Sequence, residues 1–148
     1  METTFQLLIK DHKKVQTLIN ELLSTSMNAK SQRKKLLGNL KEELQLHEKI
    51  EEEEVYPVLE KKKNLKDITL EAYQEHHIVD VLLDELESLD FKDENWKAKL
   101  TVLQENLQHH IEEEEKEIFP EAEKTLTMKE LNLMEANIKQ QKSKVTES

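Results

Sequence analysis

Cysteine is absent from this chain of 148 residues, which also has only one glycine and two prolines. Without thiols the protein has no disulfides, no thiolate metal ligands and no cysteine nucleophile. So little glycine and proline, together with 36% charged and 4% aromatic residues, is typical of an almost wholly helical chain. We therefore expect a single all-α domain over residues 1–148, long enough to bury a core.

Positive charge is also outnumbered, because 22 Lys and Arg residues stand against 32 Asp and Glu residues and leave a net charge of −10. This argues against binding to nucleic acid or to an anionic membrane surface. No run approaches the roughly 18 apolar residues of a membrane span, and the first residues carry no apolar signal core. We expect a cytoplasmic protein with no nucleic-acid or membrane partner, and the sequence leaves its oligomeric state open.

One short motif occurs twice. The segment 47–57 returns 63 positions later as 110–120, with its His-x-x-x-Glu pair and its proline in phase. A His and a Glu four residues apart lie on one face of a helix, about 6 Å apart along its axis, so both can reach one metal ion. Two copies brought together by folding would make a two-metal site. The pairs are His47 with Glu51 and His110 with Glu114.

The apolar pattern predicts that both pairs face the core. In each segment, apolar residues at steps of three and four form one helical stripe. The His and the Glu stand where an apolar residue is expected, and an ionised Glu is rarely buried unless it is paired or binds metal. Two such intrusions in the same phase favour a ligand set. The stripes are Leu37, Leu40, Leu44, His47, Glu51, Val55, Val58 and Trp96, Leu100, Leu103, Leu107, His110, Glu114, Ile118.

Two further histidines lie on apolar stripes. His12 and His76 have neighbourhoods that align at an offset of 64. The chain is therefore interpreted as a duplicated helical pair, with a His on one helix and His-x-x-x-Glu on the next. The remaining histidines, His77 and His109, lie on polar faces, so we expect them to face solvent or a helix boundary. His109 and Glu113 are an alternative pair with the four-residue spacing, but they miss the apolar stripe.

Short connections favour antiparallel neighbours, and they predict an up-down-up-down four-helix bundle over about 3–124. A short C-terminal helix is expected over about 128–142. Pro57 lies inside an apolar pattern and predicts a kink or break, and Asp67 is expected to be a helix N-cap. The four long helices are predicted at about 3–24, 30–62, 68–89 and 94–124.

These segments resemble the hemerythrin-like, His-His-Glu cation-binding family. The resemblance covers residues 7–122 and implies a non-haem di-iron centre inside a four-helix bundle. It rests on DH at 11–12, HEKIEEEEVYP at 47–57, EHH at 75–77 and HHIEEEEKEIFP at 109–120. It implies that His12, His47, His76 and His110 are nitrogen ligands, and that Glu51 and Glu114 are carboxylates bridging two irons.

Imidazole and carboxylate ligands together suit iron, and manganese or zinc would also be accepted. Each iron would have about four protein ligands, which leaves positions for dioxygen, nitric oxide or peroxide. The oxygen-carrying branch resembles a five-histidine site, but the residues one turn from His76 are Ala72 and Asp80. One iron is therefore expected to be more open. Tyr73 is expected to pack in the core or to reach the edge of the site.

Two other metal patterns are missing. A ferritin-like centre needs Glu-x-x-His pairs, and a zinc protease helix needs two histidines four apart; neither is present. Most of the acidic residues at 51–54 and 112–115 are expected on solvated faces. Glu54 and Glu117 are the candidates for supporting hydrogen bonds behind the ligands.

We expect a metal- and oxygen-binding protein rather than a classical enzyme, serving oxygen or redox sensing, storage or detoxification. The first alternative is a stress protein that turns over nitric oxide or peroxide, or donates iron for cluster repair. Repair-type relatives resemble a cysteine-bearing segment joined to this bundle, and this chain has no cysteine and a helix expected from its first few residues. The second alternative, a metal-free helical interaction module, would need two inward Glu residues without a cation.

Overall fold

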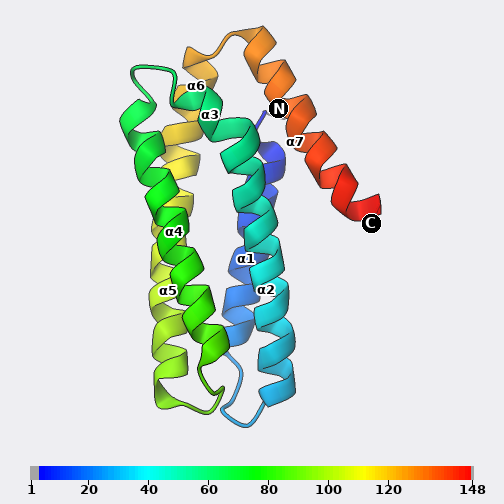
Figure 1. Ribbon diagram of the computed structural model, residues 1–148, viewed down its shortest axis with the longest axis vertical. Coiled ribbons are helices and arrows are strands. Elements are labelled where there is room, and N and C mark those ends of the chain that lie inside the picture. The colour runs from blue at the N-terminus through cyan, green and yellow to red at the C-terminus, as the bar shows by residue number, and fades with distance from the viewer. Residues whose placement is uncertain (1–3, 148) are drawn as a thin grey trace.

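The computed structural model describes residues 4–147, and the side chains of residues 4–144. Four long helical segments stand side by side, and a further helix lies outside them (Figure 1). The first and third are α1 (Gln6–Leu23) and α4 (Lys66–Ser88). The second is α2 (Lys30–Ile50), η1 (Glu51–Val55) and α3 (Tyr56–Leu59), and the fourth is α5 (Glu94–Glu113), η2 (Glu114–Ile118) and α6 (Phe119–Thr125). The outer helix is α7 (Met128–Glu147).

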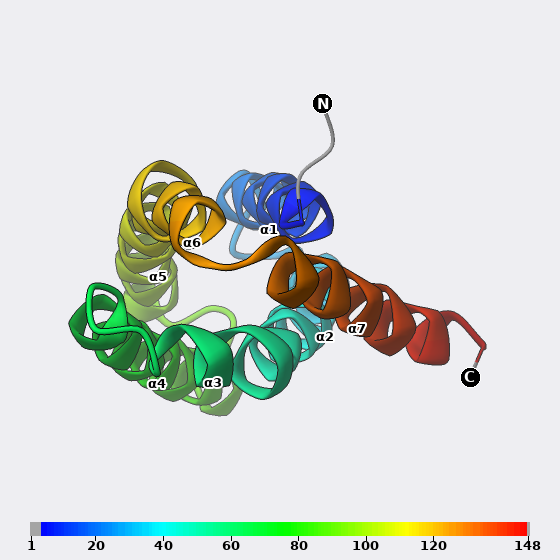
Figure 2. The same cartoon turned by 90° about the horizontal axis from the view of Figure 1, so that it is seen from above.

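Seen along its axis, the bundle runs in the order α1, α2, α4, α5, and α5 closes the circle by packing on α1 (Figure 2). Successive segments run in opposite directions because their connections are short. The predicted all-α, up-down-up-down four-helix bundle is therefore confirmed. No helix within residues 4–147 is long and apolar enough to cross a membrane.

Two apolar clusters fill the interior. One is centred on Phe5, Ile50 and Phe119, close to the α3, α6 and α7 end. The other is centred on Leu40 and Trp96, toward the opposite end. The histidines of the stripes lie at the level between these clusters, so the polar layer is shielded from solvent on both sides along the bundle axis.

The irregularity predicted at Pro57 is a π-helical turn, in which the helix widens and continues, and the same kind of turn precedes Pro120. The N–H of Tyr56 donates to the C=O of Glu51, five residues earlier, and the N–H of Phe119 donates in the same way to Glu114. A proline follows each donor. Its ring has no N–H and clashes with the carbonyl four residues before it, so the wider turn removes the conflict.

The π-helical turn also moves the buried face by one residue, which the α-helical stripe did not anticipate. Val58 was predicted to face inward and is only half-buried. Tyr56 and Leu59 are fully buried instead. The turn therefore changes which side chains approach the polar layer.

Two predicted boundaries are wrong. The N-cap of α4 is Leu65, and Asp67 lies within the first turn, where its charge is favourable near the helix N-terminus. The C-terminal helix is not short, because α7 continues to Glu147. Its length follows from docking, since Met134 and Ile138 are both buried against the bundle.

Candidate metal centre

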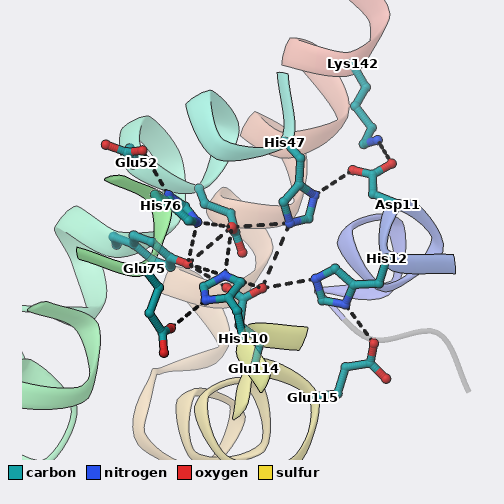
Figure 3. Close-up of polar contacts among 12 residues, drawn as sticks. Asp11, His12, His47, Glu52, Glu75, His76, His110, Glu114, Glu115 and Lys142 are labelled. Atoms are coloured by element: carbon teal, nitrogen blue, oxygen red, sulfur yellow. Dashed lines mark hydrogen bonds and ion pairs between the residues drawn. The ribbon is translucent and has the colours of Figure 1, made fainter. Parts of the chain in front are cut away.

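The six residues singled out from the stripes converge between the two apolar clusters (Figure 3). Both carboxylates are completely buried, and each of the four imidazoles is at most 5% exposed. The side chains form two groups whose ligand atoms lie within 4.8 Å of one another. The groups are His12, His47, Glu51 and Glu114, and Glu51, His76 and His110.

The other two histidines lie outside this cluster. His77 is exposed, and the side chain of His109 is 71% exposed. Both point away from the core, as their polar faces predicted. His109 lies near Glu113 and Glu75 on the surface, at 3.5 and 3.6 Å.

All four imidazoles present Nε2 to the two buried carboxylates. These nitrogens surround a small volume in which a cation would meet nitrogen and oxygen donors together. The distances are 3.0 Å from His12 to Glu114 Oε1, 3.2 Å from His47 to Glu51 Oε1, 3.0 Å from His76 to Glu51 Oε1 and 3.4 Å from His110 to Glu114 Oε1.

The opposite ring nitrogen, Nδ1, meets a further carboxylate in every case. An ionised carboxylate only accepts, so Nδ1 donates and the Nε2 lone pair is directed to the centre once its proton is lost. This is the tautomer of a metal-ligating histidine. The pairs are His12 with Glu115 (2.7 Å), His47 with Asp11 (3.0 Å), His76 with Glu52 (2.9 Å) and His110 with Glu75 (2.6 Å).

These outer carboxylates were not among the residues predicted. Glu54 and Glu117 were expected in that role, but Glu117 is exposed and Glu54 half-buried. One signal in the sequence could have identified the right residues. Each outer carboxylate directly adjoins a ligand in the chain and reaches a histidine on the neighbouring helix. The adjoining pairs are Asp11–His12, Glu51–Glu52, Glu75–His76 and Glu114–Glu115.

Tyr56 is the other residue that sequence reasoning missed. Its hydroxyl donates to Glu114 Oε2 at 2.6 Å and lies 3.2 Å from Glu51 Oε1. It is also 3.3 Å from Nε2 of His76 and 3.5 Å from that of His110. Tyr73, the tyrosine that was considered, packs edge-on against the Tyr56 ring at 5.2 Å.

The two halves of the centre differ beside Tyr56, because the repeat does not conserve this tyrosine. The counterpart of Tyr56, 63 positions later, is Phe119. The Phe119 ring lies parallel to that of His12, with centroids 6.2 Å apart, and stacks on Phe5. The His76 and His110 half thus has a phenol beside it, whereas the His12 half has an apolar ring.

The buried carboxylates are held ionised by the imidazoles. Burial and the charge of Glu114 both raise the pKa of Glu51, but attraction to His47 and other polar contacts outweigh them and lower it to about 2. Burial likewise raises the pKa of Glu114, and attraction to His110 lowers it well below its usual range. Burial and both carboxylates raise the pKa of the Tyr56 phenol well above its usual value, so it remains protonated.

The pKa values of the imidazoles shift in the opposite direction, upward. Burial disfavours the charged ring of His76, but hydrogen bonds to Glu51 and Glu52 outweigh it and raise the pKa to about 9. Burial also opposes charge on His47 and His110, and attraction to the buried carboxylates raises both pKa values well above the usual one. Without metal, protons therefore balance the charge of the carboxylates.

We expect the metal-free protein to be most stable near pH 4.5 and to lose stability toward pH 9, because Glu48 ionises near 4.5 when unfolded and stays protonated to about pH 9 when folded. The folded pKa of His76 is raised, so its contribution is complete below the unfolded value of 6.5 and disappears as pH rises through about 9. The pKa of Glu51 is lowered, so its contribution is present above 4.5 and disappears as pH falls toward about 2.

The His76 shift alone corresponds to on the order of 3 kcal/mol. Thermal unfolding of chelator-treated protein across this pH range measures the effect. An unfolding midpoint that rises between pH 6.5 and 9 would contradict it.

The donor set fits a metal cation. His47 Nε2 and Glu51 Oε2 are buried and have no hydrogen-bond partner among the described residues. Buried polar atoms of this kind need a partner, and a cation between the carboxylates and the Nε2 atoms would supply one. Imidazole nitrogen with carboxylate oxygen is also the ligand chemistry that iron, zinc and manganese accept.

Comparison with known proteins agrees with this chemistry. The family model described as the Hemerythrin HHE cation binding domain matches residues 3–122. The chain belongs to the hemerythrin HHE cation-binding domain family. This HHE domain therefore comes from a family that binds cations, and its buried His and Glu groups could hold a metal ion.

A solved structure has the same fold. It is the crystal structure of a hemerythrin HHE cation binding domain-containing protein from Mycobacterium kansasii, and the TM-score is 0.76 at 24% sequence identity. The match covers 97% of this HHE domain chain and 90% of the M. kansasii chain. No curated protein sequence matches this chain.

Proposed function

We propose that this HHE domain holds two iron ions and binds dioxygen, nitric oxide or peroxide at them. The observation that carries the proposal is the orientation of the four imidazoles, each with Nδ1 held by a carboxylate and Nε2 turned to a shared centre. Bound iron would supply open coordination positions for a small ligand. The proposed ligands are His12, His47, His76 and His110, with Glu51 and Glu114 bridging both irons.

The charges support two divalent ions with an added anion. Two ferrous ions bring four positive charges, and the two buried carboxylates offset half of them. An anionic small ligand shared between the ions would therefore be favoured. Manganese and zinc suit the same donors. Zinc does not change oxidation state, and iron is proposed over manganese because the family resemblance implies iron.

A small cavity beside the imidazoles suits a diatomic ligand. Its volume is about 20 Å³, enough for about one water-sized molecule. Its walls also include Glu48, a buried carboxyl whose pKa is raised to about 9 by burial and by Asp80. Glu48 therefore adds little negative charge to the cavity near neutral pH. The apolar lining residues are Val15, Leu44, Val79, Leu107 and Ile111.

A larger groove of about 290 Å³ lies between α1 and α5 and shares Val15, Leu107 and Ile111 with this cavity. Because these three residues line both the groove and the cavity, movement of their side chains would open a route for a small molecule to the site. The Gln16 amide donates to Gln108 across the groove at 3.1 Å. This arrangement favours small ligands over large ones.

The second candidate is turnover of peroxide or nitric oxide, and Tyr56 favours it. The Tyr56 hydroxyl lies within 3.5 Å of Nε2 of both His76 and His110. A phenol at that place could donate a proton to a ligand bound in the same half of the centre. Reversible oxygen binding needs no such proton, whereas turnover of peroxide does.

The two candidates are separated by titrating the ferrous protein, prepared without air, with oxygen, nitric oxide and peroxide. We expect a change in the visible spectrum with at least one of them. Bands that vanish on degassing would indicate oxygen carriage, and peroxide consumption would indicate turnover. In Tyr56→Phe, turnover should fall by about tenfold or more while iron content is unchanged. An iron-loaded protein that responds to none of the three ligands would refute the proposal.

A further inference from the structure

The C-terminal helix α7 docks on one side of the bundle. It begins at the α3 and α6 end, contacts η1, and its C-terminal end points away from the bundle (Figures 1 and 2). Met134 and Ile138 are buried in the interface. The whole helix follows the residues that match the family model, which end at residue 122.

One side chain of α7 is connected to the imidazole cluster. The Lys142 ammonium donates to Asp11 Oδ1, and Asp11 Oδ2 accepts from Nδ1 of His47 at 3.0 Å (Figure 3). Asp11 is only 7% exposed, and hydrogen bonds from His47 and Lys142 outweigh its burial and lower its pKa. The carboxylate is therefore an ion held between a charged helix and a ring of the centre.

Among the described side chains, the second half of the repeat has no equivalent contact with α7. The counterpart of Asp11, 64 positions later, is Glu75, which holds His110 at 2.6 Å. The other Glu75 oxygen lies 3.6 Å from the exposed ring of His109. Asp11 and Glu75 therefore do the same task with different support, because within residues 4–144 Asp11 alone of the two pairs with a side chain of α7.

We propose that α7 is a strap that positions His47 through Lys142 and Asp11, so that metal affinity in the His12 and His47 half depends on the docking of α7. This inference rests on the proposed metal centre. A carboxylate behind a ligating histidine fixes the ring and raises its basicity, and its loss typically weakens metal binding by about 10–100-fold. Lys142 acts one contact further out, so a loss of about tenfold is expected in that half alone.

The link is reciprocal, because two binding events coupled by a free energy affect each other equally. If docking of α7 tightens metal binding, metal binding must also tighten the docking of α7. The metal should therefore slow hydrogen exchange of the amides around Ile138 and Lys142, although neither residue is a ligand.

The test is a titration of the full chain with cobalt(II), whose visible bands report occupied sites, without air. In wild-type protein we expect two bound ions. In Lys142→Met we expect one affinity to fall about tenfold and the other to be unchanged. Lys142→Arg should restore wild-type behaviour, because a guanidinium can also pair with Asp11. Hydrogen exchange of α7 should slow with cobalt in wild-type protein and much less in Lys142→Met.

Lys62→Met is the matched control. It removes the ion pair between Lys62 and Glu130 (3.0 Å), which also anchors α7 but has no connection to Asp11. The Lys142–Asp11 contact and the buried Met134 and Ile138 still hold α7 in this variant, so both cobalt affinities should be unchanged. Equal losses in Lys62→Met and Lys142→Met would overturn the positioning role, and so would wild-type affinities in Lys142→Met. Wild-type protein that binds no cobalt would overturn the metal centre itself.

Discussion

His110→Ala is expected to lose most of its iron, whereas His109→Ala, one position earlier, keeps two irons per chain. Nε2 of His110 lies 3.4 Å from Glu114 Oε1 inside the bundle, and the side chain of His109 is 71% exposed. Removing a positioning carboxylate typically costs about 10–100-fold in metal affinity, so removing a ligand should cost at least that much. Elemental analysis after ferrous reconstitution without air and desalting measures the content.

Glu114→Ala should behave like His110→Ala, because both supply donors to the same centre. His77→Ala should behave like His109→Ala. An empty site in His109→Ala together with a full one in His110→Ala would show that the fourth helical segment is rotated relative to the arrangement described. Far-ultraviolet circular dichroism on each variant establishes that the bundle remains folded.

Binding of two metal ions is expected to raise the unfolding midpoint by roughly 15–30 °C. At a free metal concentration about a thousand times the dissociation constant, each site adds about 4 kcal/mol to the native state. Two sites add about 8 kcal/mol, and each kcal/mol shifts the midpoint by about 2–4 °C in a chain of this size. Thermal unfolding with and without ferrous ion, or with zinc in air, measures the shift.

The matched variants for this measurement are Glu51→Ala and Glu54→Ala. Glu51 is completely buried between the two groups of ligands, so Glu51→Ala should lose most of the metal-dependent shift. Glu54 is half-buried, three residues away and outside both groups, so Glu54→Ala should keep it. A wild-type midpoint that does not move with metal would contradict the proposed centre.

The bundle and its six inward polar side chains could be predicted because both follow from one periodicity. His47 and Glu51 are in phase with the leucines before them, and the same holds for His110 and Glu114. A helix that buries its apolar stripe must bury whatever else lies on that stripe. Whether they meet at one level depends on helix register, which the sequence alone does not establish.

Tyr56 could not be found in the same way, because its position depends on a turn that is not α-helical. Five residues after Glu51, an ordinary α-helix would direct Tyr56 away from the stripe. In the π-helical turn the two residues are joined by a backbone hydrogen bond and lie on the same face. Pro57 indicated that the helix is irregular there but not the form of the irregularity.

The outer carboxylates could not be predicted from the sequence for a different reason. Asp11 and Glu75 lie beside the stripes, at the borders between helices, where a helical pattern does not distinguish a solvated acid from one that reaches a neighbour. Their partners are 36 and 35 positions away along the chain. Only the packed arrangement of adjacent helices reveals these contacts.

The four hydrogen bonds from histidine Nδ1 to the outer carboxylates form a closed ring around the bundle. Each helical segment gives one carboxylate to its neighbour and receives one on its own histidine, in the order first, second, third, fourth and back to the first. Sliding any one segment along its axis would therefore break two of these hydrogen bonds at once, one with each neighbouring segment. The ring of hydrogen bonds fixes the positions of the four imidazoles along the bundle axis before any metal ion binds, so metal binding should need little reorganisation of the side chains.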